Sequence, residues 1–196
     1  MPISITPLNL KNLASIFSRN IDPNQSTQFS FSRFLVPYLS GYQGWSIFMD
    51  NDMVCLDDIA ELWELRDDNY AVMCVKHDYT VKENVKFLGE KQTQYPKKNW
   101  SSVMLLNNAK CKALTKEFVN RASGLELHQF KWLDSEELIG EIPKEWNYLA
   151  DYYPEKNNAK LIHYTDGGPY FDDYKNCDFA QQWLDALESS QYIKKT

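Results

Sequence analysis

Short apolar runs separated by polar stretches are the dominant pattern along this chain. The clearest runs are Trp45–Met49, Tyr70–Val75 and Val103–Asn107. Compact apolar runs bounded by polar residues are typical of strands buried in a sheet. Three weaker runs predict further short strands: Ile3–Leu8, Phe130–Leu133 and Lys160–His163.

Between these runs, apolar residues recur at the spacing of helices. Apolar residues at positions 10, 13, 16 and 17 predict a helix over Leu10–Arg19. Asp58 is a typical cap for a helix through Leu65, which places Ile59, Leu62 and Trp63 on one face. Three other segments also predict helices: Phe29–Leu39 disturbed at Pro37, Thr115–Ser123 ended by Gly124, and Asp178–Ser189 with Phe179, Trp183 and Leu187 in one stripe.

Polar Asn20–Ser26, which contains Pro23, predicts a loop. Buried strands that alternate with helices indicate an α/β protein whose sheet is covered on both faces. The 196 residues fit one domain, 1–196, without internal repeats. Apolar residues at 43% and aromatic residues at 14% supply enough bulk for a core and exclude a disordered chain.

Charge and cysteine content narrow the classes of function. A net charge of −6 argues against a general nucleic-acid binder, which would carry a basic surplus. No apolar stretch reaches the ~20 residues that span a bilayer, and the first residues lack the features of a signal peptide. The four cysteines form no C-x-x-C pair, so we expect free thiols and a cytoplasmic protein without a membrane span.

The main candidate for chemistry is Asp50-Asn51-Asp52, directly after the Trp45–Met49 run. In an extended segment residues i and i+2 point to the same side, so the two carboxylates converge at the carboxyl end of a strand. That end is where open α/β sheets bind ligands, and paired carboxylates suit a hard divalent cation that in turn holds a diphosphate. The alternative is an ordinary turn, because Asp and Asn commonly follow strands.

A second candidate is the segment from His163 to Phe171, which follows a short apolar run. An imidazole added to two carboxylates favours Mn²⁺ over Mg²⁺, because nitrogen ligands suit transition metals. Gly167 and Gly168 would allow the backbone to approach a ligand closely. The alternative for His163 is a hydrogen-bonded structural histidine, and His77 is interpreted as a surface residue at a strand end.

Two further polar segments gain meaning only from their context. Lys97–Ser102 leads into the Val103–Asn107 run and by itself is interpreted as a loop. The acidic residues Glu136 and Glu137 could equally mark the solvated start of a helix. Trp146 and Asn147 follow shortly after them.

Taken in order, these segments resemble the glycogenin-like family of retaining glycosyltransferases, and the similarity covers nearly the whole chain. The blocks that carry the resemblance are Phe31–Pro37, Asp50–Asp52 with Asp57–Trp63, Asn99–Ser102, Glu145–Asn147 and His163–Gly168. The resemblance is closest to a little-studied bacterial and viral branch. It implies the GT-A fold, a Rossmann-like, mixed and mostly parallel sheet flanked by helices, here without the family's usual first strand-helix unit.

The resemblance also implies roles for individual residues. Asp50 and Asp52 match the family's D-x-D motif, and His163 matches its third metal ligand. Arg33 matches an arginine near the donor sugar and its phosphates, and Trp146-Asn147 matches a pair beside the acceptor. Other positions fall in blocks that contact the nucleotide sugar, namely Asn51, Asn99, Ser101, Ser102, Gly167 and Gly168. A direct part in transfer is implied for Asn107, Glu136 and Glu137, the last two near an acidic block that touches the donor sugar.

The implied activity is transfer of a hexose from a nucleotide sugar, most simply a UDP-sugar, with retention. The cofactor would be Mn²⁺, with Mg²⁺ as the second choice, and the acceptor a glycan, a lipid or a protein. Two departures motivate an alternative, a truncated non-catalytic domain that binds a sugar or a partner. Pro169-Tyr170-Phe171 stands where the family has a diphosphate-binding Lys, and the missing first unit would expose a sheet edge that favours a homodimer. A third and weaker hypothesis is a two-metal phosphohydrolase.

Overall fold

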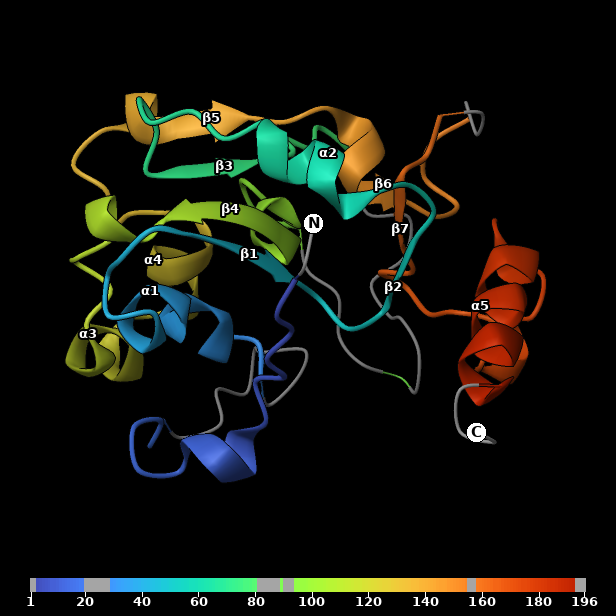
Figure 1. The fold of residues 1–196 in the computed structure, drawn as a ribbon, viewed down its shortest axis with the longest axis horizontal. Coiled ribbons are helices and arrows are strands. Elements are labelled where there is room, and N and C mark those ends of the chain that lie inside the picture. Colours follow the sequence, from blue (N-terminus) through green and yellow to red (C-terminus); the bar gives the residue numbers. More distant parts are fainter. Residues whose placement is uncertain (1–2, 20–28, 81–88, 90–93, 155–157, 193–196) are drawn as a thin grey trace.

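Two small mixed sheets form the centre of the protein in this computed structural model, which describes residues 3–19, 29–80, 89, 94–154 and 158–192 (Figure 1). The larger sheet has the order β1-β4-β3-β5 and the smaller one the order β2-β7-β6. The strands of the larger sheet are β1 (Trp45–Met49), β3 (Val72–Cys74), β4 (Val103–Asn107) and β5 (Ile139–Glu141). Those of the smaller sheet are β2 (Met53–Cys55), β6 (Tyr148–Leu149) and β7 (Leu161–His163).

The mixed α/β architecture is confirmed, but the expectation of mostly parallel pairing is wrong for the described strands. Strands β1 and β3 both pair antiparallel with β4, and β2 pairs antiparallel with β7. Of the strand pairs that the structure describes, only β3–β5 and β6–β7 are parallel. In the larger sheet the physical reason is the placement of β4: β1, β3 and β5 run in one direction, and β4 enters between β1 and β3 in the opposite one.

In the described part of the chain, five α-helices and several 3₁₀ turns surround the sheets. The α-helices are α1 (Val36–Leu39), α2 (Ile59–Glu64), α3 (Lys116–Arg121), α4 (Gly124–His128) and α5 (Ala180–Tyr192). The 3₁₀ turns are η1 (Leu10–Leu13), η2 (Ser32–Leu35), η4 (Trp100–Ser102), η5 (Asn108–Lys110), η6 (Glu136–Leu138), η7 (Lys144–Asn147) and η8 (Asp172–Tyr174). The expected caps are confirmed, since Asp58 accepts from Ala60 N and Thr115 accepts from Phe118 N.

Alternate residues of the larger sheet bury opposite faces, as the strand period requires. One face, with Val72 and Met104, packs against apolar residues of η2, α3 and α4. The other face, with Met73 and Leu105, packs against Leu62 of α2 and Trp146 of η7. Both faces are therefore covered, as the sequence predicts. Strand β1 forms one edge and is only half-buried, rather than buried as expected.

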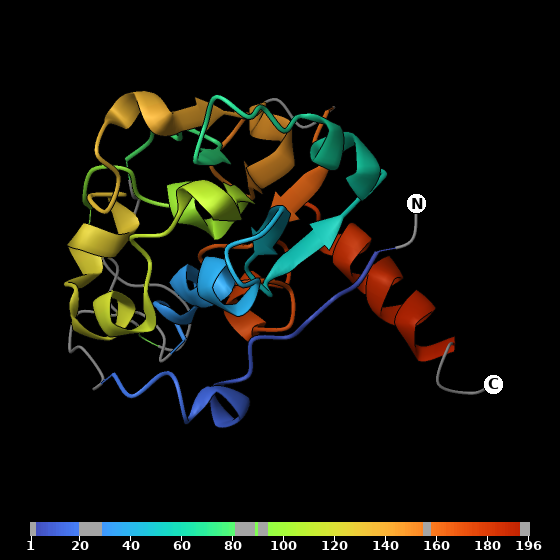
Figure 2. The same ribbon diagram turned by 60° about the vertical axis from the view of Figure 1, so that its left-hand side comes forward.

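The smaller sheet has its own core, which anchors the first part of α5. Ile162 and Tyr164 are buried there, and Phe179 and Trp183 pack against them. Figure 2 shows α5 along one side of the molecule, with its end pointing away from the body. Leu187, the third residue of the expected stripe, is 39% exposed, so the stripe packs only through its first part. Among the described helices, none is both long and apolar enough to cross a membrane.

Several predicted elements are wrong in type or extent. Ile3–Leu8 forms no strand, and Ile5 is 80% exposed, because this segment pairs with no described strand. Phe130–Leu133 is a turn, since Phe130 has a left-handed φ of 56° directly after α4. Leu10–Arg19 contains only the short η1, and Phe29–Leu39 contains η2 followed by α1. The expected loop Asn20–Ser26 lies outside the described residues.

Gly124 begins a helix instead of ending one. The side chain of Ser123 accepts from Glu126 N while the Glu126 carboxylate accepts from Ser123 N, which is a capping box. A Cβ at Gly124 would lie 2.9 Å from the ring of Phe31. The glycine is thus explained by close packing against Phe31 at the start of a helix. The sequence around Gly124 does not reveal this contact, because Phe31 is distant along the chain.

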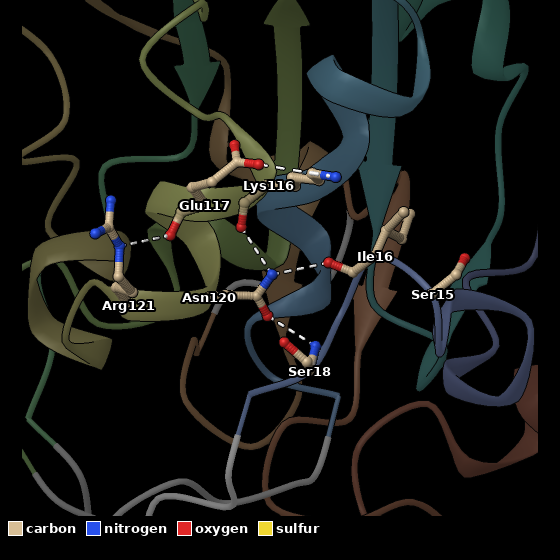
Figure 3. Close-up of a pocket in the computed structure, with 7 residues that line it drawn as sticks. All are labelled: Ser15, Ile16, Ser18, Lys116, Glu117, Asn120 and Arg121. Atoms are coloured by element: carbon tan, nitrogen blue, oxygen red, sulfur yellow. Dashed lines mark hydrogen bonds and ion pairs between the residues drawn. The ribbon is translucent and has the colours of Figure 1, made fainter.

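An open pocket on the surface lies where the N-terminal segment meets α3 (Figure 3). Asn120 of α3 donates from Nδ2 to Ile16 O at 2.8 Å and accepts from Ser18 N at 2.8 Å. Lys116, Glu117 and Arg121 complete the rim. Because the asparagine bridges the two segments, the pocket marks a structural junction that ties residues 15–18 to the helix.

The closest packing at a strand glycine yields a prediction about stability. A Cβ at Gly140 would lie 2.6 Å from Tyr70 Cδ2 and 2.8 Å from Met73 Cγ. We expect Gly140→Ala to lower the free energy of unfolding by about 1–3 kcal/mol through overpacking, as measured by urea denaturation. In the control Tyr70→Ala/Gly140→Ala, the loss should be less than the sum of the two single losses. A single variant within about 0.5 kcal/mol of wild type would contradict the close contact.

Candidate functional site

The end of β1 and the pairing of β2 with β7 bring three candidate ligands together. Asp50 N donates to Ser102 O at 2.9 Å, which holds the first carboxylate beside the start of β4. Met53 pairs with His163, and Tyr164 N donates to Asp52 O at 3.0 Å. Asp52 therefore meets His163 across two neighbouring strands, with 3.5 Å between Asp52 Oδ1 and His163 Nε2.

Asp50, Asp52 and His163 have the donor set of a divalent cation site. One ligand atom from each of the three residues lies within 4.8 Å of those from the other two. Two carboxylate oxygens and one imidazole nitrogen suit a divalent transition ion. The residues present thus fit the cation that the sequence suggests, and the expectation that the two carboxylates converge on one side is met.

Arg33 holds Asp50 in place through a two-point ion pair. Its Nη2 lies 2.8 Å from Asp50 Oδ1, and its Nη1 lies 3.1 Å from Oδ2. The guanidinium also donates from Nε to Ser30 O at 2.8 Å and from Nη1 to Ser101 O at 2.9 Å. A planar guanidinium fixed at four points leaves the Asp50 carboxylate little rotational freedom.

The electrostatics of Asp50 favour a cation nearby. Burial raises the pKa of Asp50 above its usual value, the Arg33 guanidinium opposes this shift, and the Asp52 carboxylate adds to it. Two neighbouring carboxylates partly removed from water repel one another, and one guanidinium offsets only one of them. A divalent ion at this place would favour the charged form of both.

Behind the imidazole lies a chain of buried polar groups. His163 Nδ1 is 3.1 Å from Asn147 Oδ1, and Asn147 Nδ2 is 2.8 Å from Ser102 Oγ. Ser102 Oγ donates to Asn99 O at 2.6 Å. Asn147 was expected beside an acceptor, whereas the structure places it, fully buried, against the ring of His163. Its position depends on the packing of η7 on β7, which no local pattern indicates.

The serines of the Asn99–Ser102 segment face the protein interior. Ser101 is 3% exposed and Ser102 is 1% exposed. Ser101 Oγ lies 2.7 Å from His128 Nδ1, and Ser102 Oγ belongs to the polar chain behind His163. The structure therefore brings both serines close to the candidate ligands as supports of Arg33 and His163, and a direct contact with a nucleotide sugar stays a prediction.

The three residues expected to act in transfer are not members of the cluster formed by Asp50, Asp52 and His163. Asn107 pairs with Trp45 at the start of β1, so a strand of five residues separates it from Asp50. Glu136 lies at the surface, where its carboxylate pairs with Lys97 Nζ at 2.6 Å, and Glu137 is also exposed. Ser135 caps η6 directly before them, in keeping with the alternative of a solvated helix start.

The glycines after β7 are explained by the protein's own tyrosines. Gly167 has a φ of 142°, and a Cβ there would lie 2.7 Å from Tyr174. At Gly168 a Cβ would collide with the ring of Tyr170. Asn51, between the two carboxylates, is exposed. Contacts of these three residues with a ligand stay predictions.

An aromatic and polar cluster next to the candidate ligands was not expected from the sequence. His77 is 8% exposed instead of lying on the surface, and its Nδ1 is 2.6 Å from Tyr153 Oη. Asn99 Nδ2 donates to Tyr79 Oη at 2.8 Å and to Thr165 Oγ1 at 3.0 Å. Thr165 lies two residues after His163. The alternation of side chains along an extended segment was the one sequence signal that could have indicated that Thr165 lies on the same side as His163.

With this geometry established, comparison with known proteins identifies the family. The model of the family described as "Glycosyl transferase family 8" matches residues 9–169. The chain belongs to glycosyl transferase family 8. "Protein CDI" of Arabidopsis thaliana is 49% identical over 197 residues, which cover 96% of this chain and 76% of that protein.

Solved structures of glycosyltransferases confirm the GT-A fold. The bifunctional glycosyltransferase WbbM in its apo form superposes with a TM-score of 0.59 at 15% identity, over 87% of this chain and 36% of that one. Apo GlyE of Streptococcus pneumoniae TIGR4 gives 0.54 at 12% identity, over 86% of this chain and 47% of that one. The galactosyltransferase LgtC, solved with donor and acceptor sugar analogues, gives 0.55 at 12% identity, over 93% of this chain and 73% of that one.

This chain of family 8 therefore spans less than half the length of the WbbM and GlyE chains that it matches. At identities of 11–15% these structures establish the fold, while the family match establishes a domain of the glycosyltransferase class.

Burial of His77 predicts an acid-sensitive fold. Burial, with a smaller effect of His163, lowers the pKa of His77 to about 3. In the unfolded state the imidazole takes up a proton near pH 6.5. The neutral ring therefore contributes its full share to the free energy of unfolding above about pH 6.5. This contribution declines by up to ~1.4 kcal/mol per pH unit as the pH falls towards 3. Urea denaturation should show a shallower acid decline in His77→Gln than in wild type. Identical declines would contradict the burial of a neutral ring.

Proposed function

We propose that this chain is the catalytic domain of a metal-dependent glycosyltransferase that moves a hexose from a UDP-sugar to a glycan, lipid or protein acceptor. The observation that carries the proposal is the convergence of Asp50, Asp52 and His163 at the end of β1, with Arg33 fixed beside them. Membership of glycosyl transferase family 8 supports the reaction class. The galactosyltransferase LgtC, described with donor and acceptor sugar analogues, supports a sugar donor and a sugar acceptor.

The cation we propose is Mn²⁺, with Mg²⁺ as the second choice. Asp50, Asp52 and His163 would hold it, and an imidazole nitrogen among the ligands favours the transition ion. When bound, a divalent ion neutralises the negative charge that develops on the leaving diphosphate. The affinity of the three ligands for the ion sets the affinity for the donor, so we expect donor binding to depend on the metal.

Arg33 is proposed to act on the donor through its one remaining hydrogen. Four of the five N–H groups of the guanidinium already donate to Asp50, Ser30 and Ser101. Among the described contacts this leaves one hydrogen on Nη2, the atom that contacts Asp50 Oδ1. Its position favours a donation to a phosphate or to the donor sugar, while the rest of the side chain stays in place.

We also propose that the transfer retains the anomeric configuration. We further propose that the chain belongs to a glycogenin-like branch of bacterial and viral enzymes. The similarity of the five sequence blocks supports both. The relative that is 49% identical is a plant protein, which extends the range of organisms beyond that expectation.

The proposal predicts metal-dependent binding of UDP that Asp52→Asn weakens. In calorimetric titrations, wild type should bind UDP with Mn²⁺ and show no measurable binding without it. Asp52→Asn should weaken binding at least tenfold, because the cation loses a charged ligand at its centre. Asp172→Asn is the matched control, since Asp172 pairs with Lys175 at the surface and its side chain is 90% exposed.

Two results would contradict this proposal. Wild-type protein that binds no UDP in either condition would favour the alternative, a non-catalytic domain that binds a sugar or a partner. Normal Mn²⁺-dependent binding and UDP-hexose turnover in Asp52→Asn would remove the metal role of this carboxylate. Thermal unfolding of both variants would show that each is folded.

A further inference from the structure

The ring of His163 lies between two groups that contact opposite nitrogens. Its Nε2 faces Asp52 Oδ1 at 3.5 Å, and its Nδ1 faces Asn147 Oδ1 at 3.1 Å. His163 is 2% exposed, and Asn147 has no exposed surface. A neutral imidazole carries its hydrogen on one nitrogen only, so the group that contacts Nδ1 decides what Nε2 presents to the candidate cation site.

The orientation of the Asn147 amide follows from a backbone carbonyl, which can only accept. Asn147 Nδ2 lies 3.3 Å from Asn99 O, so the NH₂ group must occupy this side. The Ser102 hydroxyl donates to the same Asn99 oxygen at 2.6 Å, which leaves its lone pairs to accept from Asn147 Nδ2 at 2.8 Å. Both contacts place Oδ1, an acceptor, against His163 Nδ1.

We propose that Asn147 is a positioning residue that, held by Ser102 and Asn99, keeps His163 in the Nδ1–H tautomer and aims the Nε2 lone pair at the cation site. His163 Nδ1 donates to Asn147 Oδ1, so Nε2 carries no hydrogen in the neutral ring. A metal ligand must present a lone pair, and this arrangement supplies it before any cation binds. The inference rests on the proposed function and extends it from the ligands to the residues that support them.

Asn99 connects this network to the strand that carries the histidine. Its side chain donates to Thr165 Oγ1 at 3.0 Å, two residues beyond His163, while its carbonyl accepts from Ser102 and Asn147. Asn99 adopts a left-handed φ of 61°, a conformation that asparagine tolerates better than most residues. Hydrogen bonds therefore connect both His163, through Asn147, and the nearby Thr165 to Asn99. These connections limit rotation of the imidazole.

The direct test is the tautomer of His163 in the metal-free protein. Nitrogen-15 NMR at about pH 8.5, where an ordinary imidazole is neutral, distinguishes a protonated Nδ1 from a protonated Nε2. The chain has three histidines, so His77→Gln and His163→Gln identify the signal. We expect the Nδ1–H form in wild type, and a dominant Nε2–H form there would overturn the proposal whatever the metal does.

Three variants separate positioning from general support of the fold. Asn147→Leu keeps a side chain of similar size but removes the acceptor, so the Nε2–H form should become populated. Asn147→Asp retains an acceptor and should preserve the Nδ1–H form. Ser102→Ala leaves Asn147 oriented by Asn99 O and should also preserve it. A tautomer in Asn147→Leu that is unchanged from wild type would contradict the role of Asn147.

Calorimetric titration with Mn²⁺ alone supplies a second measurement. We expect Asn147→Leu to bind Mn²⁺ about 10–100-fold more weakly than wild type, and Asn147→Asp to recover most of the affinity. Equal affinities in wild type and Asn147→Leu would overturn the link from the tautomer to the cation. If wild type shows the Nδ1–H form yet binds no Mn²⁺, the proposed function fails while the positioning of His163 by Asn147 stands.

Discussion

The antiparallel pairing of β2 with β7 is the constraint on which the site depends. It places Met53 opposite His163 and lets Tyr164 N donate to Asp52 O. Without this pairing, the end of β1 would present two carboxylates and no nitrogen ligand. The smaller sheet therefore positions a candidate metal ligand in addition to its own core, because the packing of Phe179 and Trp183 on it holds the strand that carries His163.

Charge balance explains why the residues around the carboxylates are so firmly held. Burial and the neighbouring Asp52 carboxylate raise the pKa of Asp50, and the two-point contact of the Arg33 guanidinium with Asp50 opposes this shift. Arg33 is itself held by carbonyls of Ser30 and Ser101, and His163 by Asn147. Candidate ligands preorganised in this way would need little rearrangement to bind a cation, which would favour affinity.

Local features of the chain could be predicted from the sequence, because they depend on neighbours along it. The runs at Trp45–Met49 and Val103–Asn107 form strands with the expected bounds, and Asp58 and Thr115 cap their helices. The carboxylates converge as the sequence predicts, although the chain bends at Asn51 and Asp52. Features that depend on long-range packing could not be predicted. The reversed direction of β4 makes two of the three pairings in the larger sheet antiparallel, and Asn147 lies behind His163 because η7 packs on β7.

The most direct test of the cation site is anomalous diffraction from crystals of the wild-type protein grown with Mn²⁺. We predict one manganese ion bound by carboxylate oxygens of Asp50 and Asp52 and by Nε2 of His163. A fully occupied manganese site elsewhere with none at these residues, or an ion here bound without His163, would contradict the conclusion that the β2–β7 pairing assembles a cation site.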